Sequence, residues 1–153
     1  MDPSSTPCIG NANGVSRFSR NLPSVAWAIF TPLHTLVLSN GVCIISTTNN
    51  QVEYDVVIGL LVDALDHYIL QLHFGLDSLL LVMQLNGVYH VHNQVLFRKN
   101  LRVKLLVREF ETITFGHVPR AQNHYVDMIA NNILYWNLSH IRRHPQQQKS
   151  GEP

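Results

Sequence analysis

The stretch TTNNQVEYDVVIGLLVDAL, residues 47–65, predicts one long amphipathic helix that begins at Asn49 or Asn50 and runs to about Tyr68. On such a helix Glu53 lies on the same face as the apolar residues Val56, Val57, Leu60 and Ala64. Two interpretations account for an acid on a face that should be buried. Glu53 closes a capping box in which Asn50 is the N-cap residue, or it is a carboxylate that a functional site requires.

The composition fits a single domain, and its charges are unevenly distributed. The chain has 153 residues, of which 46% are hydrophobic, and its net charge is only +1. A chain of this length can bury a sizeable core. No Lys or Arg occurs from Asn21 to Phe97, whereas basic residues outnumber acids from Arg98 onward. Either this segregation is one ordinary solvated surface, or bound cations neutralise the acids while the basic half meets a polyanion.

The cysteines and the apolar segments point to an intracellular protein, in the cytoplasm or nucleus. Cys8 and Cys43 form neither a disulfide framework nor a metal-ligand spacing. The first residues lack the apolar core of a secretory signal, so we expect no secretion. Three acids, Asp63, Asp66 and Asp77, interrupt the longest apolar region, so we expect no membrane span.

Hydrophobic periodicity predicts an α/β domain over residues 24–141, between an irregular segment at 1–23 and a polar tail at 142–153. Strands are expected at 24–30, 35–46, 69–74 and 112–118, and helices at 49–68, 77–87, 93–110 and 122–141. In the helix at 93–110 the expected apolar stripe comprises Leu96, Leu101, Leu105 and Leu106. This order of elements predicts a mixed sheet with helices on both faces.

Two further acids occupy positions that suit a site. Asp77 comes after a buried strand, where open α/β sheets bind their ligands, although Asp77 or Ser78 would also serve as an ordinary N-cap. Asp127 lies in the last predicted helix, in line with Ala130 and Leu134. Convergence of these two acids with Glu53 would give a cluster of oxygen ligands, which suits Mg²⁺ or Mn²⁺ and not Zn²⁺.

Three segments together resemble the ribonuclease H domain in the version found in plant retrotransposon polyproteins. These segments are TTNNQVEY (47–54), LDSLLLVMQLNGVYHV (76–91) and HVPRAQNHYVDMIAN (117–131). The family shows T-N-N-x-x-E-Y, then D-S-x-L-x-V-x-Q-x-N-G-x-Y, then H-[IV]-P-R-x-x-N-x-x-x-D-x-x-A. The resemblance covers residues 24–136, in the family's order and with similar spacing.

The resemblance implies cleavage of the RNA strand in RNA–DNA hybrids by two Mg²⁺ ions held on carboxylates. By motif position Glu53, Asp77 and Asp127 would be catalytic metal ligands. The residues implied in nucleic-acid binding are Thr48, Asn49, Asn50 and Gln84, together with Arg98 and Arg102 among the basic residues of the helix at 93–110. It also implies that the ancestral element carried this domain within a larger polyprotein.

The chain departs from the family at its first carboxylate. The family opens with an apolar strand that ends in Asp-Gly-Ser, whereas SRFSRN (16–21) has Ser16 where that Asp is expected, and Asp2 lies too far upstream. We therefore expect the first strand of the sheet to be missing or replaced, and hydrolysis to be weak. Two alternatives stay open: a non-catalytic nucleic-acid-binding module, and a truncated retroelement remnant that folds poorly by itself.

Overall fold

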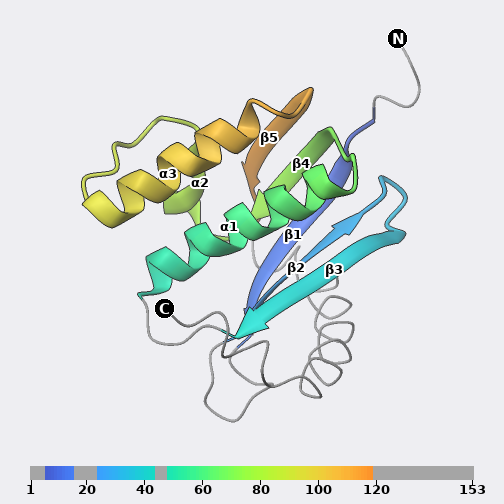
Figure 1. The fold of residues 1–153 in the computed structure, drawn as a ribbon, viewed down its shortest axis with the longest axis horizontal. Coiled ribbons are helices and arrows are strands. Elements are labelled where there is room, and N and C mark those ends of the chain that lie inside the picture. Colours follow the sequence, from blue (N-terminus) through green and yellow to red (C-terminus); the bar gives the residue numbers. More distant parts are fainter. Residues whose placement is uncertain (1–5, 16–23, 44–47, 119–153) are drawn as a thin grey trace.

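The computed structural model describes residues 6–15, 24–43 and 48–118, which form a five-stranded sheet and three helices (Figure 1). The strands are β1 (Cys8–Val15), β2 (Ser24–Phe30), β3 (Leu36–Cys43), β4 (Gln71–Leu76) and β5 (Thr112–His117). The helices are α1 (Asn49–Asp66), α2 (Leu79–Leu85) and α3 (Gln94–Val107). None of these helices is long and apolar enough to cross a membrane.

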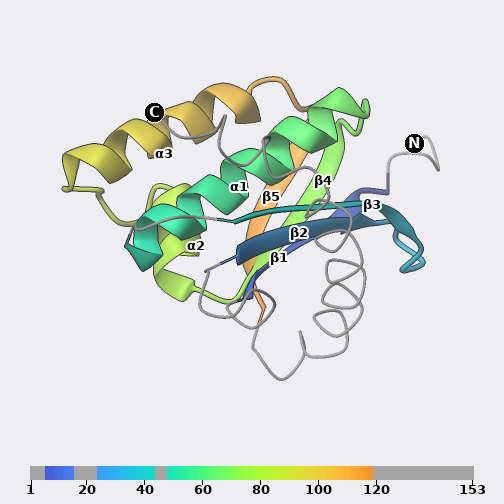
Figure 2. The ribbon, with the colours of Figure 1, turned by 60° about the horizontal axis from the view of Figure 1, so that its bottom comes forward.

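The sheet is mixed, and its strand order is β3-β2-β1-β4-β5. β1 pairs with β2 and β2 with β3 in antiparallel fashion, whereas the β1–β4 and β4–β5 pairs are parallel. The helices α1 and α3 lie over one face of this sheet (Figure 2), and α2 packs against β4 and β5. The predicted helix at 122–141 and the tail at 142–153 lie outside the described residues, so a helix on the second face stays a prediction.

The first strand of the sheet is present, so the expectation of an irregular segment throughout 1–23 is wrong for Cys8–Val15. This segment, CIGNANGV, has low strand propensity, but β1 is the central strand and forms ladders with both β2 and β4. Its small residues also have a packing function. A Cβ atom on Gly10 would lie 3.2 Å from Leu60 Cδ2, so glycine lets α1 approach the sheet closely.

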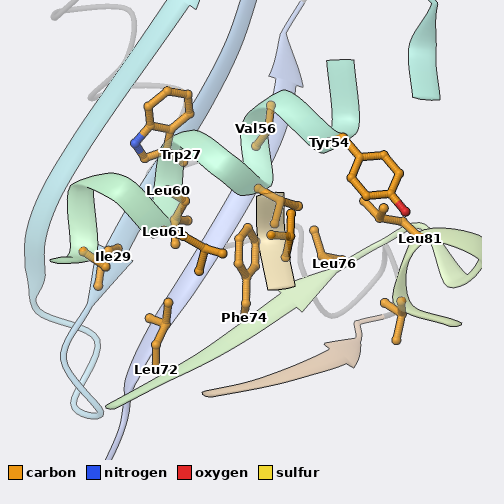
Figure 3. Packing of buried hydrophobic residues seen from close by; sticks show 14 of the residues in the cluster. Trp27, Ile29, Tyr54, Val56, Leu60, Leu61, Leu72, Phe74, Leu76 and Leu81 are labelled. Atoms are coloured by element: carbon orange, nitrogen blue, oxygen red, sulfur yellow. The ribbon is translucent and has the colours of Figure 1, made fainter. Parts of the chain in front are cut away.

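The core lies between α1 and the sheet (Figure 3). Trp27 of β2 and Phe74 of β4 meet Leu60 and Leu61 of α1, and all four side chains are buried. Gly59 faces the Trp27 ring, and a Cβ atom there would lie only 2.5 Å from Trp27 Cη2. The packing of α1 against β2 therefore depends on a glycine in the helix and an indole in the strand.

The buried stripe of α3 differs from the predicted one. Leu96, Asn100 and Val103 are buried, whereas Leu101 and Leu105 are exposed to solvent. A polar residue therefore takes a core position, and two leucines face outward beside the basic residues of the helix. The expected apolar stripe was correct only for Leu96 and, in part, Leu106, which is half-buried.

Candidate functional site

The candidate site begins where β4 ends and α2 starts. Asp77 follows Leu76, the last residue of β4, and its side chain is exposed. Ser78, and not Asp77, is the N-cap residue of α2, because the Ser78 hydroxyl accepts a hydrogen bond from Leu81 N at 3.3 Å. Asp77 therefore has no capping function in α2, and its carboxylate faces solvent at the carboxyl end of a parallel strand.

The start of α1 brings Glu53 to the same place. The N-cap residue is Thr48, whose hydroxyl accepts from Gln51 N at 3.3 Å. The capping-box interpretation with Asn50 as N-cap is therefore wrong, since Glu53 lies beyond the first turn of the helix. Glu53 is half-buried, less deeply than the helical pattern predicted.

Glu53 and Asp77 lie close enough to influence each other. Burial raises the pKa of the Glu53 carboxyl above its usual value, the negative charge of Asp77 raises it further, and a hydrogen bond with Ser78 opposes the shift. A half-buried carboxylate beside a second, exposed one favours a bound cation, because a cation would relieve both the repulsion between them and the desolvation of Glu53. The structure thus joins two of the three predicted acids.

The third acid, Asp127, lies outside the described residues. Within residues 6–15, 24–43 and 48–118, no three His, Cys, Asp or Glu side chains gather into a group that could hold a metal ion. The oxygen donors of Glu53 and Asp77 suit Mg²⁺ or Mn²⁺, but two carboxylates form only part of such a site.

The segment predicted to approach nucleic acid lies at the amino end of α1. The side chains of Thr48 and Asn50 are exposed, and Asn49 is the first residue of the helix. The Thr48 hydroxyl accepts a hydrogen bond from Gln51 N and so helps to fix where α1 begins. Backbone N–H groups at a helix start, together with the exposed Asn50 amide, can bind phosphate or hydroxyl oxygens.

Gln84 belongs to a hydrogen-bond network that joins the three helices. Its Oε1 accepts from the Tyr54 hydroxyl at 2.9 Å, and Asn100 Nδ2 donates to that hydroxyl at 3.2 Å. Tyr54 and Asn100 are buried, so this network holds α1, α2 and α3 together beside Glu53. Gln84 therefore has a structural function in this network. A contact between Gln84 and nucleic acid stays a prediction.

The basic residues of α3 divide into two groups. Lys99 Nζ lies 2.6 Å from Asp55 Oδ1 and so ties α3 to α1. Arg98 and Arg102 are exposed, one helical turn apart, and border an open hollow of about 580 Å³ between α1 and α3. These two guanidinium groups are therefore available to meet phosphates, whereas Lys99 is already engaged by a carboxylate.

The sequence interpretation named Ser78 as a possible N-cap but missed its hydrogen bond with Glu53, and it missed Asn100 altogether. For Ser78 a signal existed, since a hydroxyl residue directly after an acid at a strand end can hydrogen-bond to neighbouring carboxylates. For Asn100 no local signal existed, because the sequence around it predicts an exposed side chain. Its burial depends on the Tyr54 hydroxyl, which comes from a different helix.

Comparisons with known proteins agree with this geometry. The family model described as "Reverse transcriptase-like" matches residues 11–133. Ribonuclease HI of Halobacterium salinarum is 34% identical over 122 residues, which are 80% of this chain and 61% of that relative. The chain thus spans less than two thirds of that relative's length.

Two crystal structures show the same fold. Ribonuclease H1 from Halobacterium salinarum superposes with a TM-score of 0.71 at 32% identity, and the match covers 82% of this chain and 95% of that one. LC11-RNase H1 in complex with an RNA/DNA hybrid superposes with a TM-score of 0.69 at 25% identity, covering 82% and 94% of the two chains. The predicted mixed α/β sheet of ribonuclease H type is therefore confirmed.

Proposed function

Because this chain belongs to the reverse transcriptase-like family, we propose that it is a ribonuclease H-type domain that binds RNA–DNA hybrids and hydrolyses them weakly. The observation that carries the proposal is the pairing of Glu53 with Asp77 at the carboxyl end of β4. The similarity to a ribonuclease H1 that was crystallised with an RNA/DNA hybrid supports the choice of ligand.

The proposed metal site comprises Glu53, Asp77 and Asp127, with Mg²⁺ or Mn²⁺ as the ion. When bound, such ions would activate a water molecule and stabilise the leaving oxygen of the RNA strand. The residues themselves contribute oxygen ligands, and Ser78 orients Glu53 through its hydrogen bond. We expect weak hydrolysis because this set has one carboxylate fewer than the family pattern.

The proposed nucleic-acid surface joins the amino end of α1 to the exposed arginines of α3. Thr48, Asn49 and Asn50 would lie in the minor groove of the hybrid, where 2′-hydroxyl groups distinguish RNA from DNA, and Gln84 would add a polar contact. Arg98 and Arg102 would meet phosphates. The spelling of the three motifs supports the finer assignment to a plant-type retroelement, in which the domain would be part of a larger protein. The cysteine content supports a location inside the cell.

Binding is tested by fluorescence anisotropy with a labelled RNA–DNA hybrid and a matched DNA duplex over a range of salt concentrations. We expect the hybrid to bind more tightly. In an R98A/R102A variant the slope of log K against log salt should fall by about 0.9 for each lost phosphate contact. Arg108→Ala removes the same type of charge at the end of α3 and serves as the control.

Cleavage is tested with the same hybrid in Mg²⁺ and in Mn²⁺. Binding without appreciable turnover is the expected result. Robust cleavage that Asp77→Asn abolishes would contradict weak hydrolysis, and equal affinity for hybrid and duplex DNA would overturn the choice of ligand. The presence of the central strand β1 supports the proposed hybrid-binding domain over the alternative of a poorly folding fragment.

A further inference from the structure

The register of the sheet identifies a residue that the motifs did not. In the parallel β1–β4 ladder Asn11 pairs with Gly75. Continued by two residues, the same register would set the backbone of Asn13 beside Asp77, which follows the last residue of β4. The antiparallel ladder on the other side independently fixes Asn13 opposite Ala26. β1 and β4 are parallel neighbours (Figure 1), so the carboxyl end of β1, which contains Asn13, lies at the same end of the sheet as the carboxyl end of β4, which Asp77 follows.

This position is where a further ligand would stand. Asp77 already has Glu53 beside it, and a further oxygen ligand from the neighbouring strand would extend this pair at the carboxyl end of the parallel strands. The residue pair there is Asn13-Gly14, which differs from Asp-Gly only by an amide in place of a carboxylate. The register therefore favours Asn13 over Ser16, which follows the strand and lies outside the described residues.

An amide and a carboxylate have nearly the same size but differ in charge. An amide oxygen can coordinate Mg²⁺ or Mn²⁺, but it brings no negative charge to offset the dehydration of the ion. Affinity for a divalent cation rises with the number of charged ligands. A site with Asn at this position should therefore hold such an ion more weakly than the same site with Asp.

We propose that Asn13 stands at the first ligand position of the site and that this single amide keeps the domain a hybrid binder with weak affinity for divalent cations. The proposal rests on the proposed function and deepens it. It implies that the remaining parts of the site are intact, so that Asn13→Asp alone strengthens cation binding. The substitution adds one charge and almost no volume.

Titration calorimetry with Mn²⁺ alone, and melting with and without Mn²⁺, compare the wild-type chain with three variants. Asn13→Asp should bind Mn²⁺ about tenfold more tightly or better and melt at a higher temperature when Mn²⁺ is present. N13D/D77N should lose that gain. Asn93→Asp is the matched control, because it adds the same charge at the N-cap of α3. Hybrid cleavage should rise in Asn13→Asp only.

Each outcome separates this proposal from the proposed function. If Asn13→Asp binds Mn²⁺ no more tightly than Asn93→Asp, while hybrid binding persists, the assignment of Asn13 is overturned and the proposed function stands. If the wild-type chain does not bind hybrid, the proposed function fails instead. If Asn13→Asp does not fold, the Mn²⁺ affinity of Asn13→Ala is compared with that of the wild-type chain. An unchanged affinity overturns the assignment of Asn13, and a lower affinity supports it.

One chemical control belongs to this experiment. Asn-Gly sequences deamidate readily, because the glycine nitrogen attacks the side-chain amide, releases ammonia and forms a succinimide that water opens to Asp or isoAsp. An aged wild-type sample could therefore contain the Asp form at position 13. Intact-mass spectrometry and peptide mapping before each titration keep the wild-type reference an asparagine.

Discussion

At the scale of single residues, Glu53 links stability to pH. Burial and the nearby Asp77 raise the pKa of its carboxyl, so the folded state favours the protonated acid. The stability that Glu53 contributes is therefore fully present below the pKa of an unfolded glutamate, and it is lost as the pH rises through the higher folded pKa. At neutral pH the ionised side chain destabilises the fold.

We accordingly expect Glu53→Gln to be more stable than the wild-type chain at neutral pH, by up to about 1 kcal/mol because solvent screens a half-exposed group. This difference in stability should disappear when the pH is below the range in which an ordinary glutamate titrates. Urea unfolding at a series of pH values measures it. Glu109→Gln removes a charge from an exposed position and serves as the control. A less stable Glu53→Gln at neutral pH would contradict the assigned cause.

The residues of the site were only partly predictable from the sequence. The helical period identified Glu53 as an unusual acid, and the strand end identified Asp77. The choice of N-cap was not predictable, because Thr48, Asn49 and Asn50 are all good capping residues and stand in a row. Thr48 takes that position in the fold, and this choice placed Glu53 beyond the first turn.

At the scale of elements, one carboxylate holds α1 against the first strands of the sheet. Asp63 Oδ2 accepts from Trp27 Nε1 at 2.5 Å and from Asn40 Nδ2 at 3.1 Å, and so joins α1 to β2 and β3. The indole ring is buried and its hydrogen bond to Asp63 is partly buried, so the N–H depends largely on this acceptor. The close fit of Gly59 under the same ring makes the contact specific.

Asp63→Ala should therefore lower the free energy of unfolding by about 1–3 kcal/mol, because the indole N–H would lose its acceptor inside the protein. Denaturant unfolding, followed by circular dichroism, measures the change. Asp66→Ala is the matched control, since Asp66 is an exposed acid on the same helix. Equal effects of the two substitutions would show that the hydrogen bonds of Asp63 do not hold the helix in place.

Two elements show why the sequence pattern was insufficient. β1 was expected to be irregular because glycine and asparagine disfavour strands, yet ladders on both sides and the close approach of Leu60 override that preference. In α3 the sequence offers more apolar residues than one face can hold. The buried face contains Asn100, whose amide is satisfied by the Tyr54 hydroxyl of another helix. Both outcomes depend on contacts between distant segments.

At the scale of the whole molecule, the strand order predicts where the fold is most protected. β1 and β4 each pair with strands on both sides, whereas among the described strands β3 and β5 each pair with one. Amides of β1 and β4 should therefore exchange with solvent at least about tenfold more slowly than those of β3 and β5. Native-state hydrogen exchange measures this, and rapid exchange throughout β1 would revive the interpretation of a poorly folding fragment.

The central position of β1 also has a consequence for folding during synthesis. β1 leaves the ribosome before α1 and β4. The edge of β1 that later pairs with β4 therefore has no partner while the intervening chain is synthesised. An unpaired edge is a template for aggregation, and apolar, β-branched sequences are the most hazardous. The glycines and asparagines of CIGNANGV make a poor template. The same glycines and asparagines that made β1 look irregular in the sequence therefore lower the tendency of the nascent chain to aggregate before β4 has been synthesised.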